Sequence, residues 1–338
     1  MLPTFDNPQL IVKQLPPGFS IEGYTAPTGE RRKEYRVGSP NWASPIIGLP
    51  HVVGTLRGMM RTYNSRKDGE PLIMSVFHLN SFGEGDNEFF LRTIYDAYQQ
   101  VKPKDEVGFM QALHQVAVAI AGDEHANDAV SLWLALDQAG DDLQALDFGP
   151  VFTMGHVLTR WVNRPLVPFP AELSEDETSY YKNFIIQAKA DSQANNLIDV
   201  QAMRMYEGYG ARLLVQRVIE RVMANLDKAS SIAVKLQGAR NIVYAERWEL
   251  LSKRIELVKC FLYTMDNIVG YQAILDLVRQ AGIPPNPNPV LGTRNTWERE
   301  ELMKIARKEI DNAVNLRKIL LSSPDLMIET GLTPADEN

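Results

Sequence analysis

The sequence is poor in cysteine, has no long apolar run and lacks proline over its central part. Its one cysteine, Cys260, excludes an intrachain disulfide and any zinc site built from several cysteines. Because Cys260 lies among apolar residues, a buried and inert thiol is favoured over a nucleophile. No apolar run approaches the roughly 18 residues that a membrane span requires, so we expect a soluble chain without a membrane segment.

The charge balance and the first residues argue against further classes of protein. The 35 basic and 42 acidic residues give a net charge of -7, which argues against a general nucleic-acid binder but leaves a local basic groove open. Residues 1–6 contain neither the basic nor the apolar segment of an export signal. The compartment stays open, because many exported bacterial proteins also lack disulfides.

Proline divides the chain into two parts. Eight of the 20 prolines lie in the first 50 residues, whereas the 113 residues between Pro170 and Pro284 contain none. Because proline removes a backbone donor and clashes with the preceding turn, a tract without it can form long helices. We therefore expect a mainly α protein, with an irregular and partly α/β region over 1–104, a multi-helix bundle over 105–325 and a tail over 326–338.

The N-terminal region contains one good α/β unit. Residues 72–79 predict a short apolar strand, 80–87 a glycine-rich loop and 88–100 a helix, an order typical of parallel α/β sheets. A complete α/β barrel needs about 250 residues. Fewer than 105 residues precede the helical part, so we expect partial βα units and not a complete barrel.

Apolar spacing predicts the helices that follow. A first helix ends at Gly122, a second over 130–136 ends near Gly140, and a third piece covers 151–162. Beyond them, Ser174 and the glutamate three residues later have the spacing of a capping box. The first helix and a later one carry these apolar stripes: Phe109, Leu113, Val116 and Ile120, then Val215, Val218, Val222, Leu226, Ala229 and Ala233.

The strongest pattern is a seven-residue apolar repeat in the proline-free tract. It predicts a helix from 239 to 280, roughly 60 Å long, that packs on two or more neighbours. Its seam comprises Tyr244, Trp248, Leu251, Ile255, Val258, Leu262, Met265 and Val269. A second stripe comprises Leu250, Leu257, Phe261, Ile268 and Leu275. Breaks in the tract are expected at Gly208, Gly210, Gly238 and Gly282.

A last helix is expected after the proline-rich connector 283–289. Asn295 or Thr296 caps it, and Ser323 and Pro324 end it. Its predicted inner face comprises Met303, Ala306, Ile310, Ala313 and Leu320.

The glycine-rich loop after the predicted strand holds two candidate catalytic carboxylates, Glu84 and Asp86. Loops at the carboxyl ends of parallel strands bind ligands in α/β folds, and two carboxylates can serve as general acid and base. The alternative is a glycine turn in which Asp86 or Asn87 caps the following helix.

Three further residues are candidates for a sugar site. Trp42 and Trp161 offer aromatic faces that stack on a pyranose, and Arg164 can bond hydroxyls or carboxylates. The alternative is that Trp161 and Phe169 anchor the proline-rich segment to the bundle. His78, inside the predicted strand, completes the candidate set, although a structural role is the alternative there. No two histidines have metal-ligand spacing on a helix, so a histidine-rich metal site would require convergence in space that the sequence does not show. No metal ligand and no cofactor is assigned from the sequence.

The stretch from Thr159 to Pro170, followed by the capping box and Tyr180-Tyr181, resembles the helical carboxy-terminal region of large bacterial glycoside hydrolases and related uncharacterised proteins. In these a catalytic α/β barrel precedes a helical domain. Residues 315–325 also fit, and the likeness covers about residues 100–325. The acid and base of such enzymes lie on barrel strands that this sequence does not contain, so the resemblance assigns no catalytic residue here. It implies either the tail of a longer or split gene product, or a helical domain recruited for another purpose.

Three hypotheses follow for the function. The first is a carbohydrate-active protein that acts on or beside a polysaccharide, alone or with an upstream catalytic barrel. The second is a non-enzymatic helical module that binds a protein partner. The third is a metal- or cofactor-dependent enzyme with its site inside the bundle. Neither a nucleic acid nor a membrane is expected as a partner, and the oligomeric state stays open.

Overall fold

Eight α-helices, a short 3₁₀-helix and one two-stranded sheet make up the described part of the chain. The computed structural model describes residues 34–37, 49–65, 73–76, 84–144, 166, 173–181, 208–280 and 296–323. This part is predominantly helical, which confirms the predicted fold class. The expected helix 151–162, the connector 283–289 and the tail 326–338 lie outside it.

The N-terminal part contains a β-α-β unit. Strand β1 (Glu34–Val37) pairs in parallel with β2 (Ile73–Val76), and helix α3 (Val52–Ser65) lies between them in the sequence. The strand predicted over 72–79 is therefore confirmed in a shorter form. Helix α4 (Glu84–Val101) begins four residues earlier than the predicted 88, so the loop expected over 80–87 is wrong for its second half.

Helix α5 (Glu106–Ala121) has the predicted end and the predicted apolar face. Asp105 caps it by accepting a 2.8 Å hydrogen bond from the backbone N–H of Gly108, and Gly122, at a φ of 83°, ends it. The four residues of the predicted apolar face are all buried. Only glycine adopts such a φ without strain, so the stop at Gly122 has a local cause.

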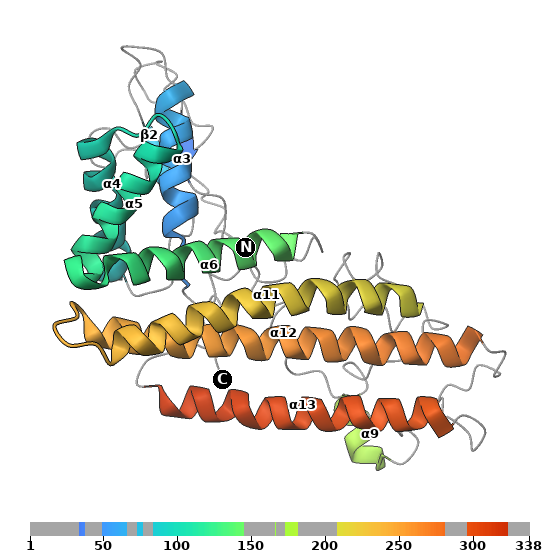
Figure 1. Cartoon of the computed structure of the whole chain (residues 1–338). Coiled ribbons are helices and arrows are strands. Elements are labelled where there is room, and N and C mark those ends of the chain that lie inside the picture. Colours follow the sequence, from blue (N-terminus) through green and yellow to red (C-terminus); the bar gives the residue numbers. More distant parts are fainter. Residues whose placement is uncertain are drawn as a thin grey trace, which may run out of the picture.

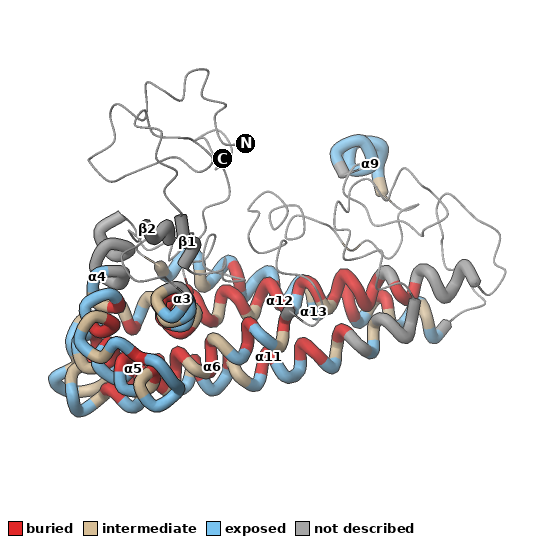
Figure 2. The backbone as a smooth tube through the Cα atoms, turned by 90° about the horizontal axis from the view of Figure 1, so that it is seen from above, coloured by how far each residue is buried: buried red, intermediate tan, exposed pale blue. Residues whose placement is uncertain are grey.

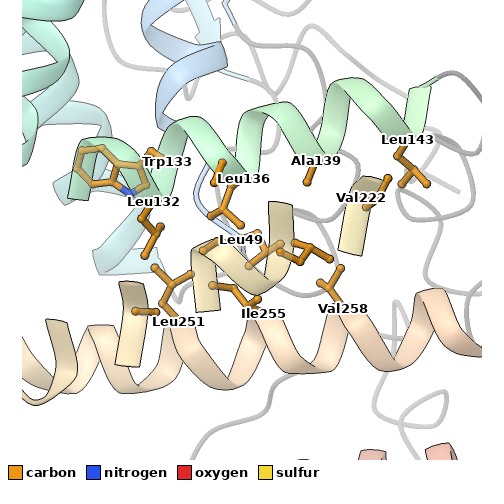
Figure 3. Close-up of a cluster of buried hydrophobic side chains, with 14 of the residues drawn as sticks. Leu49, Leu132, Trp133, Leu136, Ala139, Leu143, Val222, Leu251, Ile255 and Val258 are labelled. Carbon is orange, nitrogen blue, oxygen red and sulfur yellow. The ribbon is translucent and has the colours of Figure 1, made fainter. Parts of the chain in front are cut away.

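Helix α6 (Ala126–Gln144) follows a 3₁₀ turn, Asp123–His125. The end predicted near Gly140 is wrong, because the helix continues for another turn. A glycine inside a helix costs about 1 kcal/mol relative to alanine. Burial of Ala139 and Leu143 against the neighbouring helices outweighs that cost, and Figure 3 shows both side chains pointing from α6 into the core.

The proline-free tract forms an antiparallel helical hairpin. Helix α11 (Gly208–Gln237) and helix α12 (Ala245–Gln280) are joined by the turn 238–244. The break at Gly238 is confirmed, and the break expected at Gly210 is wrong because Gly210 lies inside α11. Gly208 is the first residue of α11, and the residues before it, like Gly282, lie outside the described part, so these two breaks stay predictions. The 36 residues of α12 span about 54 Å, somewhat less than the predicted helix.

The predicted stripes of the hairpin are almost all buried. Every residue of the α11 stripe is buried, and the α12 seam is buried from Trp248 to Val269. Tyr244 is the exception, because it precedes the helix in the left-handed region with a φ of 57°. In the second stripe Leu250 is half-buried, and the side chain of Leu275 lies outside the described set.

The long helices lie side by side in the order α6, α11, α12 and α13 (Thr296–Ser322), as Figure 1 shows. Lys235 and Asn225 of α11 contact Asp128 and Asp142 of α6, so these two helices are antiparallel. Helices α3, α4 and α5 stand across one end of α6. Figure 2 shows buried residues running along the long helices, whereas α9 (Glu175–Tyr181) is exposed.

The capping box of α9 is confirmed. The backbone N–H of Ser174 donates to the Glu177 carboxylate (2.9 Å), and the backbone N–H of Glu177 donates to the Ser174 hydroxyl oxygen (3.2 Å). These hydrogen bonds hold the pKa of the Glu177 carboxyl below its usual value.

The predicted inner face of α13 is wrong. Ala306 is buried and Met303 half-buried, but Ile310 is 62 % exposed, and Ala313 and Leu320 are exposed as well. The face turned toward α12 contains polar residues, Glu309 and Asn312, which find partners on α12. Because Glu309 and Asn312 are polar, apolar spacing does not predict that this face is the buried one.

Candidate functional site

The structure places the predicted catalytic residues on a helix. Glu84 and Asp86 are the first and third residues of α4, and their side chains lie outside the described set. Two positions that are two residues apart on an α-helix are separated by about 200° around its axis. The predicted sugar-binding residues Trp42, His78, Trp161 and Arg164 also lie outside the described residues. A shared site for these six residues stays a prediction.

Helix α13 carries two seven-residue repeats on nearly opposite sides. We call the first the inner seam, which faces α12: Leu302, Ile305, Glu309, Asn312, Leu316 and Ile319. We call the second the outer seam: Met303, Arg307, Ile310, Val314, Arg317 and Leu321. Their spacings are 3, 4, 3, 4, 3 and 4, 3, 4, 3, 4, which on an α-helix puts the two seams about 150° apart.

The inner seam fixes how α13 lies on α12. The Glu309 carboxylate accepts hydrogen bonds from the Thr264 hydroxyl (2.6 Å) and the Asn267 amide (2.7 Å), both on α12. Asn312 donates to the backbone oxygen of Cys260 (2.9 Å) and to the Thr264 hydroxyl (3.0 Å). Burial raises the pKa of Glu309, and these donors oppose the rise. The cluster is a set of mutually satisfied structural contacts that fixes the register of the two helices.

Cys260 belongs to the same cluster. Its thiol is buried and accepts a weak 3.4 Å hydrogen bond from the Asn315 amide. Burial raises its pKa to about 11, so the thiolate form is disfavoured. The expected buried thiol is therefore what the structure contains.

Apart from the half-buried Met303, the outer seam is solvent-exposed in the described structure. Ile310 is 62 % exposed, Val314 64 % and Leu321 69 %. Within the described residues α13 packs chiefly on α12, and Figure 1 shows it at one end of the row of four long helices, with α6 at the other end. Scattered exposed apolar residues are normal on a protein surface. Apolar residues that repeat every seven positions along one side of a helix are instead typical of a face that pairs with another helix.

Charged side chains accompany the outer seam. The seam itself contains Arg307 and Arg317 and no acid. A shallow open groove along the N-terminal half of α13 is lined by these residues: Arg299, Glu300, Met303, Lys304, Arg307, Lys308 and Asp311. Basic residues outnumber acidic ones in this lining by four to two. The local charge is therefore opposite in sign to the net charge of -7 of the whole chain.

A second groove lies where α5 meets α4 and α6. Its lining is mostly apolar, with Val101, Val107, Met110 and Val130, and it also contains Glu106, His114 and glutamine and asparagine side chains. Val107 is 68 % exposed. The groove is wide open.

A largely buried acid-histidine contact joins His51, the residue before α3, to Asp137 of α6. The Nε2 atom of His51 lies 3.9 Å from an Asp137 carboxylate oxygen, and both side chains are largely buried. Burial and the nearby charge of Asp141 raise the pKa of Asp137 to about 6, and Arg57 opposes the rise. The two residues are 86 positions apart, and no motif in the sequence connects them.

The described residues show no metal centre and no membrane-spanning segment. Within them, no group of three or more His, Cys, Asp or Glu side chains is placed to hold a metal ion. None of the helices in this part is long and apolar enough to cross a bilayer. Comparison of the chain with models of known families, with curated proteins and with solved structures gives no match. The resemblance to helical regions of glycoside hydrolases therefore stays a prediction.

Proposed function

We propose that this chain is a helical interaction module whose outer seam on α13 binds a protein partner. The observation that carries the proposal is the exposed apolar row of Ile310, Val314 and Leu321, which follows a seven-residue repeat along α13. The buried hairpin α11–α12 gives α13 a rigid support, and the polar contacts of the inner seam fix its rotation. A helix held in this way presents the same face continuously, which lowers the entropy cost of binding.

Isolation of the tagged full-length chain from the cells that make it tests the proposal. We expect the unmodified chain to elute with a stoichiometric partner in size-exclusion chromatography with light scattering. The double variant Ile310→Asp/Val314→Asp should elute without that partner. Val234→Asp is the matched control, because Val234 is also an exposed valine, at 56 %, on a different helix. A partner that stays bound to the double variant would contradict the proposal.

Action on a polysaccharide is the second candidate. The parallel pair β1–β2 and helix α4, which begins at Glu84, support it because they form a partial α/β unit with two carboxylates after a strand. The residues that would bind the sugar are predictions from the sequence alone, so the interaction module is the better supported of the two.

A further inference from the structure

We infer that the partner of the outer seam is an acidic amphipathic helix; this inference rests on the proposed function and names the chemistry of its partner. The seam supplies both parts of the recognition. Ile310, Val314 and Leu321 supply apolar contact. Arg307 and Arg317 supply positive charge within the same row.

The narrow width of the apolar row favours a helix as the partner over a flat surface such as a membrane. A single row with a seven-residue repeat matches the narrow seam of paired helices, whereas a helix that lies in a membrane interface needs a broad apolar face. The opposite side of α13 is already packed on α12 through Leu302, Ile305 and Leu316, which are buried. The exposed apolar contact that α13 still offers lies mainly along the outer seam, where Ile310, Val314 and Leu321 are the most exposed large apolar residues of the helix.

The two arginines set the charge of the partner. They are ten residues apart, about 15 Å along the helix, with Ile310 and Val314 between them. A partner helix that covers this strip places side chains opposite both guanidinium groups. Carboxylates at those places form charge-assisted hydrogen bonds, and lysines there are repelled.

The same positions disfavour a second copy of this chain. The seam is symmetric about its centre, so an antiparallel pair that sets Ile310 against Val314 also sets Arg307 against Arg317. A parallel pair sets each arginine against its own counterpart. Both arrangements bring like charges together in a helix interface, which destabilises it.

Two synthetic peptides test the inference with the full-length protein. Both are 21-residue amphipathic helices with leucine along one seven-residue seam; one has glutamate and the other lysine at the places that face Arg307 and Arg317. Fluorescence anisotropy should show that the glutamate peptide binds at least tenfold more tightly, and that this preference weakens as salt rises. The variant Arg307→Glu/Arg317→Glu should reverse the preference. Lys228→Glu, an exposed lysine on α11, is the control and should leave the preference unchanged.

Several outcomes would overturn the inference and leave the proposed function standing. These are equal or tighter binding of the lysine peptide and a homodimer that Ile310→Asp disperses. If the unmodified protein binds neither peptide and forms no dimer, the inference also fails. The proposed function itself fails if the partner isolated from cells is indifferent to Ile310→Asp/Val314→Asp, or if the seam instead binds vesicles of anionic lipid and Ile310→Asp abolishes that binding.

Discussion

The Glu309 carboxylate of α13 accepts a 2.6 Å hydrogen bond from the Thr264 hydroxyl of α12. The Thr264 oxygen in turn accepts a hydrogen bond from Asn312, so the acid is part of a chain of buried polar contacts. A polar network of this kind fixes one register between two helices, since a shift of α13 leaves several buried groups without partners.

Removal of the Glu309 carboxylate should therefore destabilise the fold. Glu309→Ala leaves the Asn267 amide and the Thr264 hydroxyl without their acceptor, and buried donors without acceptors cost about 1–3 kcal/mol each. We expect the free energy of unfolding to fall by about 2–4 kcal/mol in urea denaturation. Glu300→Ala, an exposed glutamate on the same helix, is the control and should change it by less than about 0.5 kcal/mol. Equal effects of the two variants would refute the role of the network.

Gly54 should tolerate alanine only when His51 is removed. A Cβ atom added at Gly54 would overlap the imidazole of His51, which packs directly on the helix backbone there. Gly54→Ala should therefore destabilise the protein, although alanine alone favours a helix by about 1 kcal/mol. In a His51→Ala background the same change should stabilise it by about 0.5–1 kcal/mol. Thermal unfolding of the four proteins of this cycle measures both effects, and the same sign in both backgrounds would contradict the packing seen here.

Asp137 should make stability depend on pH. Its pKa is about 6 in the folded protein and 3.8 as the reference value, so the folded state binds a proton first as pH falls. The contribution of this group to stability is therefore largest below pH 4 and is lost as pH rises through 6. Asp137→Asn removes the penalty of the charged form, so its gain in unfolding free energy should be larger at pH 7.5 than at pH 4.5, by about 2 kcal/mol.

Charged groups on the adjoining helices enter the same measurement. His51 precedes α3 and lies 3.9 Å from Asp137, Arg57 lies on α3, and Asp141 lies one turn further along α6. Denaturant unfolding across pH 4–8 should show the difference for Asp137→Asn. Asp96→Asn, an exposed acid on α4, should show none. A gain for Asp137→Asn that is constant across pH would mean that the buried acid keeps its ordinary pKa.

The carbohydrate prediction has a direct test. If the chain hydrolyses a glycan by itself with Glu84 and Asp86, then Glu84→Ala/Asp86→Ala should abolish release of reducing sugar from a panel of polysaccharides. The circular dichroism spectrum and the melting temperature should stay unchanged. Asp96→Ala, an exposed acid on the same helix, is the matched control. Unchanged turnover in the double variant would rule out these two residues as acid and base.

The sequence predicted the elements that have a continuous buried stripe of apolar residues. The buried faces of α5, α11 and α12 could be predicted from the regular spacing of their apolar residues. The ends of α5 and α11 could be predicted from the glycines that follow them, Gly122 and Gly238. The predicted inner face of α13 was wrong because this helix has two seven-residue repeats on nearly opposite sides. Apolar spacing alone does not indicate which of the two is buried. The face chosen by tertiary contact is the one with Glu309 and Asn312, whose partners lie about 45–50 positions away.

The sequence could not indicate the contact between His51 and Asp137 at all. Neither residue belongs to a motif, and the fold alone brings α3 and α6 together. The outer seam could have been found from its spacing of 4, 3, 4, 3, 4 between Met303 and Leu321. Its exposure could not, because that depends on which side of α13 lies on α12.

Site-specific photo-crosslinking in the cells that make the protein tests the central claim most directly. A photoreactive phenylalanine is placed at Val314 in the outer seam or, as the control, at Val234 on α11, two valines with similar exposure of 64 % and 56 %. We predict a crosslink from position 314, and none from position 234, to a segment of another protein that mass spectrometry identifies as an acidic amphipathic helix. A crosslink from position 314 only to this same chain, or identical products from both positions, would contradict the account.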